Sequence, residues 1–324
     1  MSNPIPALRA SPPPGQPAVP QAMADPVIET ENLVKRYGRT TALDGLSMRV
    51  PRGEVFGFLG PNGAGKTTAV KLLVGLTAPT AGDGRVLGRP LGDVAARRAI
   101  GYLPELFRYQ PWMSGRELLA FHGRLAGLPR AEQAGAITDA LEIVGLRDRA
   151  QDRVGGYSKG MQQRLGLAAA LLGRPELVFL DEPTSALDPV GRMEMRPIIR
   201  GLKERGTTVF LNSHLLTEVE QVCDRVAIID RGKVVALGTL EELLAEDEVR
   251  FRVGGLDEAG RAGLARYGSV RDDGEWLAVR GLAADRVPEV VAALVAGGAR
   301  VYAVEPRRES LEERFSRLVS GGDG

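Results

Sequence analysis

The fold of this chain is decided by one run, Gly60-Pro61-Asn62-Gly63-Ala64-Gly65-Lys66-Thr67-Thr68. It matches the phosphate-binding pattern G-x-x-x-x-G-K-[ST]. Residues 55–59 before it are predicted to form a buried strand, and residues 67–76 after it begin a helix. Glycines there let backbone N–H groups approach phosphate oxygens, and the helix dipole adds positive potential. We expect Lys66 to contact the outer phosphates and the Thr67 hydroxyl to ligate Mg²⁺.

The overall composition excludes several classes of protein. The chain has 324 residues, 42 of them basic and 41 acidic, and its net charge is +1. This balance gives no support to a broadly basic surface, so no nucleic-acid partner is expected. The single cysteine, Cys223, excludes an intramolecular disulfide framework and a thiol metal cluster. We expect Cys223 to be a small core residue rather than a reactive thiol.

The distribution of apolar residues argues against a membrane-spanning chain. No apolar run approaches the roughly 18 residues that a membrane span needs. The most apolar stretch, 165–180, is interrupted by Arg174, Pro175 and Glu176. The N-terminus has no apolar core of the signal-peptide type. The expected location is therefore the cytoplasm, or the cytoplasmic side of a membrane through partner subunits.

The pattern of apolar runs predicts an α/β fold for most of the chain. Residues 1–26 are rich in proline and are expected to form a disordered tail. Short β-rich runs follow, and residues 107–172 are predicted to be mostly helical. Continuously apolar β runs then alternate with helices, which indicates a parallel sheet covered on both faces. These runs are 177–180, 207–211 and 226–230.

A second, smaller module is predicted after residue 246. Residues 247–306 have the order βαββαβ, which suggests a small α+β, ferredoxin-like module. Residues 307–324 are expected to form a last helix, 309–319, and a tail. The module has four open roles: regulation, ligand binding, added dimer contacts, or a packing extension without ligand chemistry.

Two acidic residues end the apolar run 177–180. Asp181 is expected to hold the Mg²⁺ shell from the strand tip, and Glu182 to polarise a water for in-line attack. Alone, this pair is also consistent with an acidic turn after a buried strand. Together with the phosphate loop it indicates a nucleotide-hydrolysing site.

A capped helix lies between these two motifs. Ser158 is a plausible N-cap in the run Tyr157-Ser158-Lys159-Gly160-Met161-Gln162-Gln163-Arg164. The free N–H groups after it form a second anion site, although a helix start alone explains the pattern.

Taken together, the motifs resemble those of the nucleotide-binding subunits of ATP-binding cassette (ABC) transporters. The resemblance covers about 27–244 and implies the P-loop NTPase cassette fold, with a mixed sheet, a β-rich subdomain and a helical subdomain. The run from Tyr157 resembles the family signature Leu-Ser-Gly-Gly-Gln, and the run 181–188 resembles the acidic motif with its dimer-contact loop. His214 matches the switch histidine, and Tyr37 matches the aromatic residue that stacks on adenine. A helix cap and a strand-end core residue are the respective alternatives.

Two positions depart from the family pattern. Glu105 ends the run Ile100-Gly101-Tyr102-Leu103-Pro104-Glu105, where the family usually has glutamine. It can still ligate Mg²⁺, but its charge adds repulsion near phosphate. Lys159 and Met161 replace the usual Gly and Gln of the signature. We favour a Lys159 side chain that faces solvent or an interface. The alternative is that Lys159 adds positive charge opposite the γ-phosphate.

The resemblance also implies a mechanism. Two chains would bind two ATP molecules head to tail, as a homodimer or with a second ATPase subunit. Each ATP would lie between the phosphate loop of one chain and the Ser158–Gly160 turn of the other, with Asp188 in the adjoining loop. Glu105, Glu182 and His214 are then the catalytic candidates, and Thr67, Glu105 and Asp181 the candidate Mg²⁺ ligands.

The leading functional hypothesis is an ATPase subunit that drives an integral-membrane permease on a separate chain. The motifs and the C-terminal extension resemble exporters of the daunorubicin-resistance group, so export of a small molecule, lipid or polysaccharide is expected. The aromatic segment 106–112 resembles the groove that receives a membrane subunit, or it is ordinary core. The alternative is a soluble ABC ATPase acting on a ribosome or nucleic acid. A non-hydrolysing module is disfavoured, because Lys66, Asp181, Glu182 and His214 are all present.

Overall fold

A computed structural model describes residues 25–244, 248–307 and 310–320. The predicted disordered tail, 1–26, lies outside the described residues except for its last two positions. The chain divides into two compact units between Leu240 and Glu241. This division precedes the expected boundary at 246/247, which itself lies within the undescribed residues 245–247.

The centre of the first unit is a six-stranded sheet with the order β10-β9-β3-β8-β7-β6. Neighbouring strands are parallel except for the antiparallel β9–β10 hairpin. The interior strands β3, β7 and β8 are buried at every position, as expected for a sheet covered on both faces. The strands are β3 (Val55–Leu59), β6 (Ile100–Leu103), β7 (Leu177–Asp181), β8 (Thr208–Asn212), β9 (Arg225–Asp230) and β10 (Lys233–Thr239).

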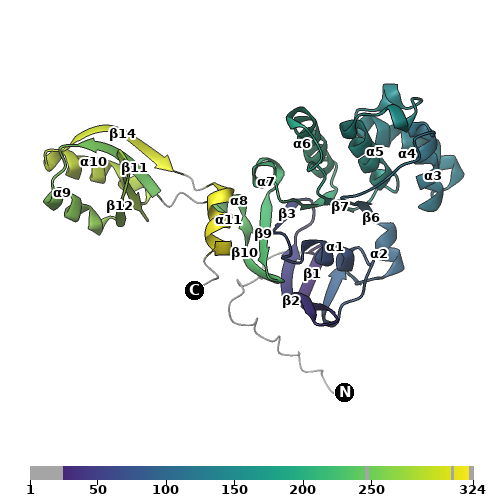
Figure 1. Cartoon of the computed structure of the whole chain (residues 1–324), viewed down its shortest axis with the longest axis horizontal. Coiled ribbons are helices and arrows are strands. Elements are labelled where there is room, and N and C mark those ends of the chain that lie inside the picture. The colour runs from purple at the N-terminus through teal and green to yellow at the C-terminus, as the bar shows by residue number, and fades with distance from the viewer. Residues whose placement is uncertain (1–24, 245–247, 308–309, 321–324) are drawn as a thin grey trace, which may run out of the picture. The chain divides into compact units, whose positions relative to one another are not determined.

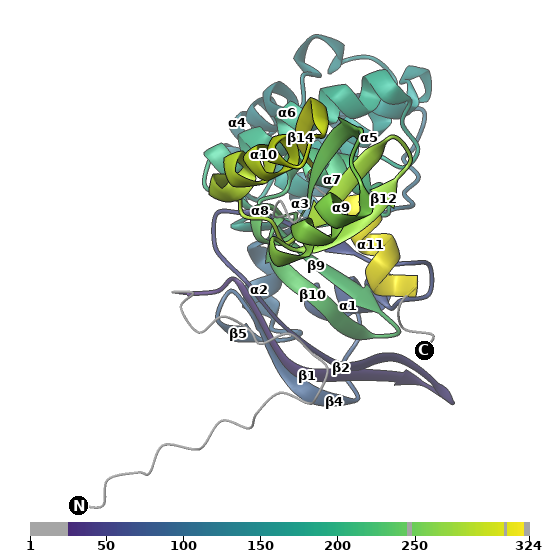
Figure 2. The ribbon, with the colours of Figure 1, turned by 90° about the vertical axis from the view of Figure 1, so that its left-hand side faces the viewer.

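A second, antiparallel sheet of the first unit has the order β2-β1-β4-β5. Helix α1 (Lys66–Leu73) shares one hydrophobic core with both sheets, and Figure 2 shows it above the strands of the antiparallel sheet. Burial on both sides of α1 fixes the position of the loop that precedes it. The strands are β1 (Ile28–Tyr37), β2 (Thr40–Val50), β4 (Ala81–Val86) and β5 (Arg89–Pro90).

Helices α3, α4 and α5 form a separate cluster in the first unit (Figure 1). The sequence predicted helix from residue 107, but α3 begins only at Gly115, and residues 104–114 form no helix. Pro104 and Pro111 disfavour helix there, and Ser114 starts α3 through a capping box with Glu117. The helices of this unit after α1 are α2 (Val94–Arg98), α3 (Gly115–Leu125), α4 (Arg130–Ile143), α5 (Lys159–Leu171), α6 (Pro189–Glu204) and α7 (Leu216–Val222), with 3₁₀ turns at Arg147–Arg149 and Val154–Gly156.

The second unit contains an antiparallel sheet with the order β12-β13-β11-β14. With one helix after β11 and one before β14, this is the ferredoxin-like arrangement. Phe251, Leu277, Val290 and Leu294 belong to its core. After α8 (Leu240–Leu243), which begins at the division, the elements are β11 (Glu248–Gly254), α9 (Glu258–Gly263), a 3₁₀ turn (Leu264–Arg266), β12 (Ser269–Asp273), β13 (Trp276–Arg280), a 3₁₀ turn (Ala284–Arg286), α10 (Val287–Ala296), β14 (Arg300–Arg307) and α11 (Leu311–Ser320).

Within the described parts of the chain, none of the helices combines the length and the apolar composition that crossing a membrane requires.

Candidate active site

The predicted phosphate loop connects the end of β3 to the start of α1. Gly65 is the N-cap of α1 with φ 103°, and no side chain caps this helix start. A Cβ atom at Gly65 would lie 2.3 Å from the carbonyl oxygen of Ala42, so no other residue fits without a shift of the backbone. The first N–H groups of α1 therefore remain free to donate to an anion.

Lys66 lies folded back on this loop. Its Nζ donates to the carbonyl oxygens of Gly60 at 2.6 Å and Pro61 at 3.1 Å, and the residue is 8% exposed. Burial lowers the pKa of Lys66, and the charges of Glu182, Asp181 and Glu105 oppose that shift. The structure therefore brings one ammonium group together with three carboxylates.

Asp181 ends β7 and is held from the two neighbouring strands. The Nδ2 atom of Asn212 on β8 donates to its carboxylate, and the hydroxyl of Tyr102 on β6 hydrogen-bonds to it. Burial raises the pKa of Asp181, the hydrogen bond from Asn212 opposes the shift, and the charges of Glu105 and Glu182 add to it. Burial, reinforced by Asp181, raises the pKa of Tyr102 to about 12. The apo site thus disfavours the charged form of Asp181, mainly because the carboxylate is buried.

We predict that Asp181→Asn stabilises the chain in the absence of nucleotide. Folding raises the pKa of Asp181. The Asp181 carboxyl group therefore lowers the free energy of unfolding more and more as the pH rises from the ordinary value of 3.8 through the raised pKa. The variant should therefore unfold about 2–4 °C higher at about pH 8, the effect of about 1 kcal/mol in a domain of this size. Differential scanning calorimetry measures this gain. A gain that does not shrink as the pH falls toward the ordinary value of 3.8 would contradict the electrostatic cause.

Glu182 and His214 form a direct contact next to Asp181. Nδ1 of His214 lies 2.8 Å from Oε2 of Glu182, and the Glu182 N–H donates to the carbonyl oxygen of Asn212 at 2.8 Å. Glu182 is 8% exposed and has φ 53°, a left-handed conformation that is uncommon for a residue with a side chain. The His214 side chain is about half exposed. A buried carboxylate is thus paired with a ring that solvent and ligands can reach.

Three further candidates, Tyr37, Thr67 and Glu105, have exposed side chains. Tyr37, at the end of β1, is 49% exposed, and Nζ of Lys35 lies over its ring, at 4.9 Å. Thr67 and Glu105 are exposed. The exposed ring of Tyr37 can receive a flat ligand. Glu105 is close enough to Lys66 and Asp181 to influence their pKa values.

The second predicted anion site lies at the start of another helix, α5. Ser158 caps α5 by accepting from the Met161 N–H at 3.2 Å, and Lys159 is exposed. Asp188 caps α6 by accepting from the Gly191 N–H at 2.8 Å. Among the described residues, no hydrogen bond or ion pair joins Ser158, Gly160 or Asp188 to the phosphate loop. One copy of the chain therefore keeps the two predicted anion sites apart.

Sequence reasoning did not identify Tyr102 or Asn212 as site residues, although both contact Asp181. Tyr102 lies in the run quoted for Glu105, and Asn212 lies two positions before His214. Their position at the ends of strands next to β7 is the signal that was available.

The comparisons with known proteins agree with this geometry. A family model described as ABC transporter matches residues 43–185. The daunorubicin resistance ATP-binding protein DrrA3 of Streptomyces coeruleorubidus is 40% identical over 92% of this chain and 97% of its own length. This chain belongs to the ABC transporter ATP-binding proteins.

Two further similarities extend this result. The Nod factor export ATP-binding protein I of Paraburkholderia xenovorans is 39% identical over 69% of this chain and 75% of its own length. The solved structure of CbiO1 from Clostridium perfringens, described as part of an ABC transporter complex, is similar with a TM-score of 0.63 and 27% identity. That similarity covers 75% of this chain and 96% of CbiO1.

The predicted family and the cassette fold are thereby confirmed. As an ABC transporter ATP-binding protein, the chain binds ATP and hydrolyses it in support of transport. The alternative of a soluble ABC ATPase acting on a ribosome or nucleic acid is disfavoured, because the relatives are named for resistance and export.

Proposed function

We propose that this chain is the ATPase subunit of an exporter whose membrane-spanning permease is a separate chain. The observation that carries the proposal is the cluster at the strand ends, where Lys66 lies among carboxylates and Glu182 contacts His214. A daunorubicin resistance protein and a Nod factor export protein among the relatives support export as the direction.

In this proposal the cluster divides the chemistry among its side chains. Lys66 binds the outer phosphates, and leaves its contacts with the loop carbonyls when it does so. Glu182 accepts a proton from the attacking water. His214 holds the Glu182 carboxylate in position and contacts the γ-phosphate from its exposed side. Tyr37 stacks on the adenine.

The site also suits Mg²⁺. Its donors are oxygens, from Asp181, Thr67 and Glu105, which is the ligand type that Mg²⁺ prefers. Asn212 Oδ1 is buried without a hydrogen-bond partner among the described residues, so it can accept from a water of hydration. Among all the residues that the structure describes, no group of three or more His, Cys, Asp or Glu could hold a metal ion by itself. This fits a cation held by one or two carboxylates together with substrate phosphates. Bound Mg²⁺ would neutralise phosphate charge.

Two chains would complete each site. The phosphate loop of one chain would hold ATP, and the Ser158–Gly160 turn and Asp188 loop of a second chain would cover it. Ser158 caps α5 and Lys66 begins α1, and no hydrogen bond within the described residues joins them. This supports the arrangement, because the start of α5 is not used by the phosphate loop of its own chain. A homodimer is the simpler form, and pairing with a second ATPase subunit is the alternative. The ATPase domain would comprise residues 27–246, with 247–306 as an accessory module.

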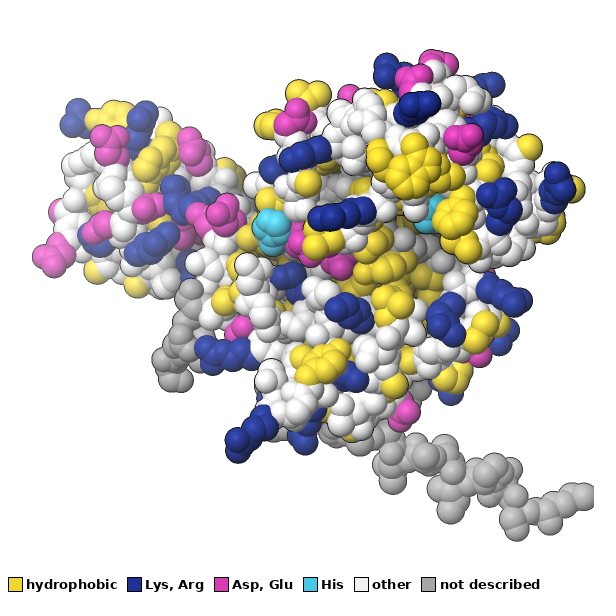
Figure 3. Space-filling model, turned by 45° about the vertical axis from the view of Figure 1, so that its right-hand side comes forward, with side chains coloured by type: hydrophobic (Ala, Val, Ile, Leu, Met, Phe, Trp, Pro, Cys, Tyr) yellow, Lys and Arg dark blue, Asp and Glu magenta, His cyan; other side chains and the backbone are white. Residues whose placement is uncertain are grey.

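A groove of about 1030 Å³ is the proposed docking site for the permease. It lies between α2, α3, α5 and the segment after β6, and Phe107, Tyr109, Phe121 and Leu125 are among its lining residues. On the face drawn in Figure 3, hydrophobic side chains gather around a hollow in the first unit. Leu125 is 70% exposed and Phe121 is 37% exposed, so the groove presents large apolar side chains to solvent. Docking there would hold the ATPase at the cytoplasmic side of the membrane.

We predict that Leu125→Asp removes the permease from the complex. A carboxylate in an apolar contact must lose its water, so co-purification of the chain with its permease should fall at least about tenfold. ATP binding should be unchanged, because Leu125 lies outside the ATP cluster. Leu76→Asp is the matched control, since Leu76 is 62% exposed and does not line the groove. Equal recovery of the permease with both variants would contradict the proposed docking site.

A further inference from the structure

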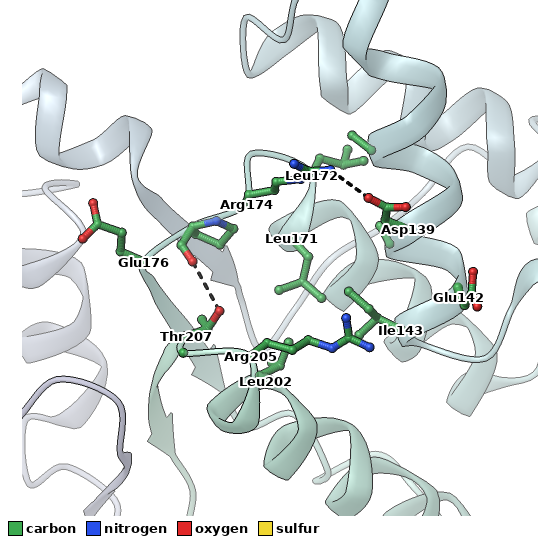
Figure 4. A pocket seen from close by; sticks show the side chains of 14 residues that line it. Asp139, Glu142, Ile143, Leu171, Leu172, Arg174, Glu176, Leu202, Arg205 and Thr207 are labelled. Atoms are coloured by element: carbon green, nitrogen blue, oxygen red, sulfur yellow. Dashed lines mark hydrogen bonds and ion pairs between the residues drawn. The ribbon is translucent and has the colours of Figure 1, made fainter.

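A second cavity, remote from the ATP cluster, remains without a role. It encloses about 660 Å³ and lies between α4, the end of α5 and the turn from α6 to β8 (Figure 4). The thirteen residues of α5, about 20 Å at 1.5 Å per residue, separate it from Ser158. The five residues of β7, about 17 Å at 3.3 Å per residue, separate it from Asp181. It is therefore not part of the nucleotide site.

The floor of this cavity is apolar. Leu171, Leu172 and Leu202 are almost completely buried, and Ile143 and Ala140 extend the same surface from α4. In Figure 4 the side chains of Leu171 and Ile143 face each other across the opening. The volume lies in the range of about 300–1,000 Å³ that small-molecule sites occupy. Such a floor suits a hydrocarbon chain or ring.

The charges at the rim are matched with one exception. Each of the three lining carboxylates is paired: Asp139 with Arg174 at 2.9 Å, Glu142 with Arg147 at 3.5 Å, and Glu176 with Arg52 at 2.7 Å. The guanidinium of Arg205 has no hydrogen bond or ion pair within the described residues. Figure 4 shows the Arg205 side chain extending across the cavity toward Ile143. The rim therefore offers one planar cation above an apolar floor.

We infer that this cavity binds a small apolar carboxylate. The Arg205 guanidinium would donate two hydrogen bonds to the carboxylate of the ligand, and the apolar body would lie on Leu171, Leu172 and Leu202. The ligand would connect α4 and α5 to the α6–β8 turn. The ion pair between Asp139 and Arg174 connects only α4 to the segment after α5 and does not reach that turn. Since the end of α5 and the segment before β7 both line the cavity, occupancy would stabilise the connection between α5, which Ser158 caps, and β7, which ends at Asp181.

Calorimetric titration of the full chain with decanoate, below its micelle concentration, tests this inference. We expect saturable binding of one decanoate per chain. Decanamide, which lacks the charge, and acetate, which lacks the apolar body, should each bind about tenfold more weakly or not at all. Saturable decanoate binding that decanamide equals, or the absence of saturable binding, would overturn the inference.

Two variants locate the binding. Arg205→Gln should weaken decanoate binding about tenfold, because it removes the charged donor. Arg130→Gln is the matched control, an exposed arginine at the start of α4 that does not line the cavity, and it should bind as the unmodified chain does. Thermal unfolding without ligand checks that both variants are folded. Decanoate should raise the unfolding temperature of the control but not that of Arg205→Gln. An Arg205→Gln chain with unchanged decanoate affinity would refute the site.

Discussion

Replacing Glu182 with glutamine is expected to slow ATP hydrolysis by about 10²–10⁴-fold while ATP still binds. The amide has nearly the same shape as the carboxylate, but it cannot accept a proton from water. Binding should persist, because Lys66 and the free N–H groups of the loop are unchanged. The γ-phosphate would then stay in place, and chains that meet around ATP should accumulate as a dimer.

Phosphate release at steady state and size-exclusion chromatography with ATP measure these two effects. Glu132→Gln, which changes an exposed carboxylate on α4, is the control and should hydrolyse ATP as the unmodified chain does. Normal turnover by a folded, ATP-binding Glu182→Gln chain would show that another group accepts the proton. Slow turnover without a dimer would instead count against the two-chain site.

The second large effect is expected from Lys66→Ala, which should weaken ATP binding at least about thirtyfold. Lys66 is a buried cation that the structure places among Glu105, Asp181 and Glu182. Without it, three carboxylates would face the phosphates, and the repulsion would be opposed only by backbone N–H groups. Hydrolysis should be lost as well, because the complex does not form.

Lys71→Ala is the matched control for this substitution. Lys71 lies on the same helix but is exposed, so its removal changes the net charge equally without touching the cluster. Equilibrium dialysis with labelled ATP gives both affinities. Equal affinity of the two variants would mean that the loop binds phosphate through its backbone alone.

The sequence predicted the interior of the first unit better than its edges. Strands β3, β7 and β8 are uninterrupted apolar runs, because both of their faces are buried. Strand β6 was missed, since it is short and contains Gly101. A Cβ at Gly101 would lie 2.4 Å from the Ala170 carbonyl oxygen, so packing against α5 selects a residue with poor strand propensity. Strand β4 was missed for a related reason: its two glycines and mostly exposed positions give no alternation of apolar and polar residues.

The same contrast holds for the candidate site. Motif spacing predicts which residues contact ATP, because the predicted contacts come from one strand and the loop after it. The residues that position Asp181 depend on register between strands. Asn212 is opposite Asp181 in the β7–β8 pairing, 31 positions away along the chain. No local sequence pattern predicts a pairing between positions so far apart. Segment 104–114 was predicted as mostly helical because the residues after it have helical periodicity, but it forms no helix.

The uncapped start of α1 has a consequence for how the protein survives in the cell. The helix that joins the two sheets begins without a side-chain partner for its first N–H groups, so bound nucleotide supplies the contacts that a serine or aspartate supplies elsewhere. Nucleotide at about 100 times its dissociation constant would add about 2.7 kcal/mol to the free energy of unfolding. The ATP concentration would then set the fraction of unfolded chains as well as the rate of hydrolysis. A fall in ATP would expose more of the protein to degradation.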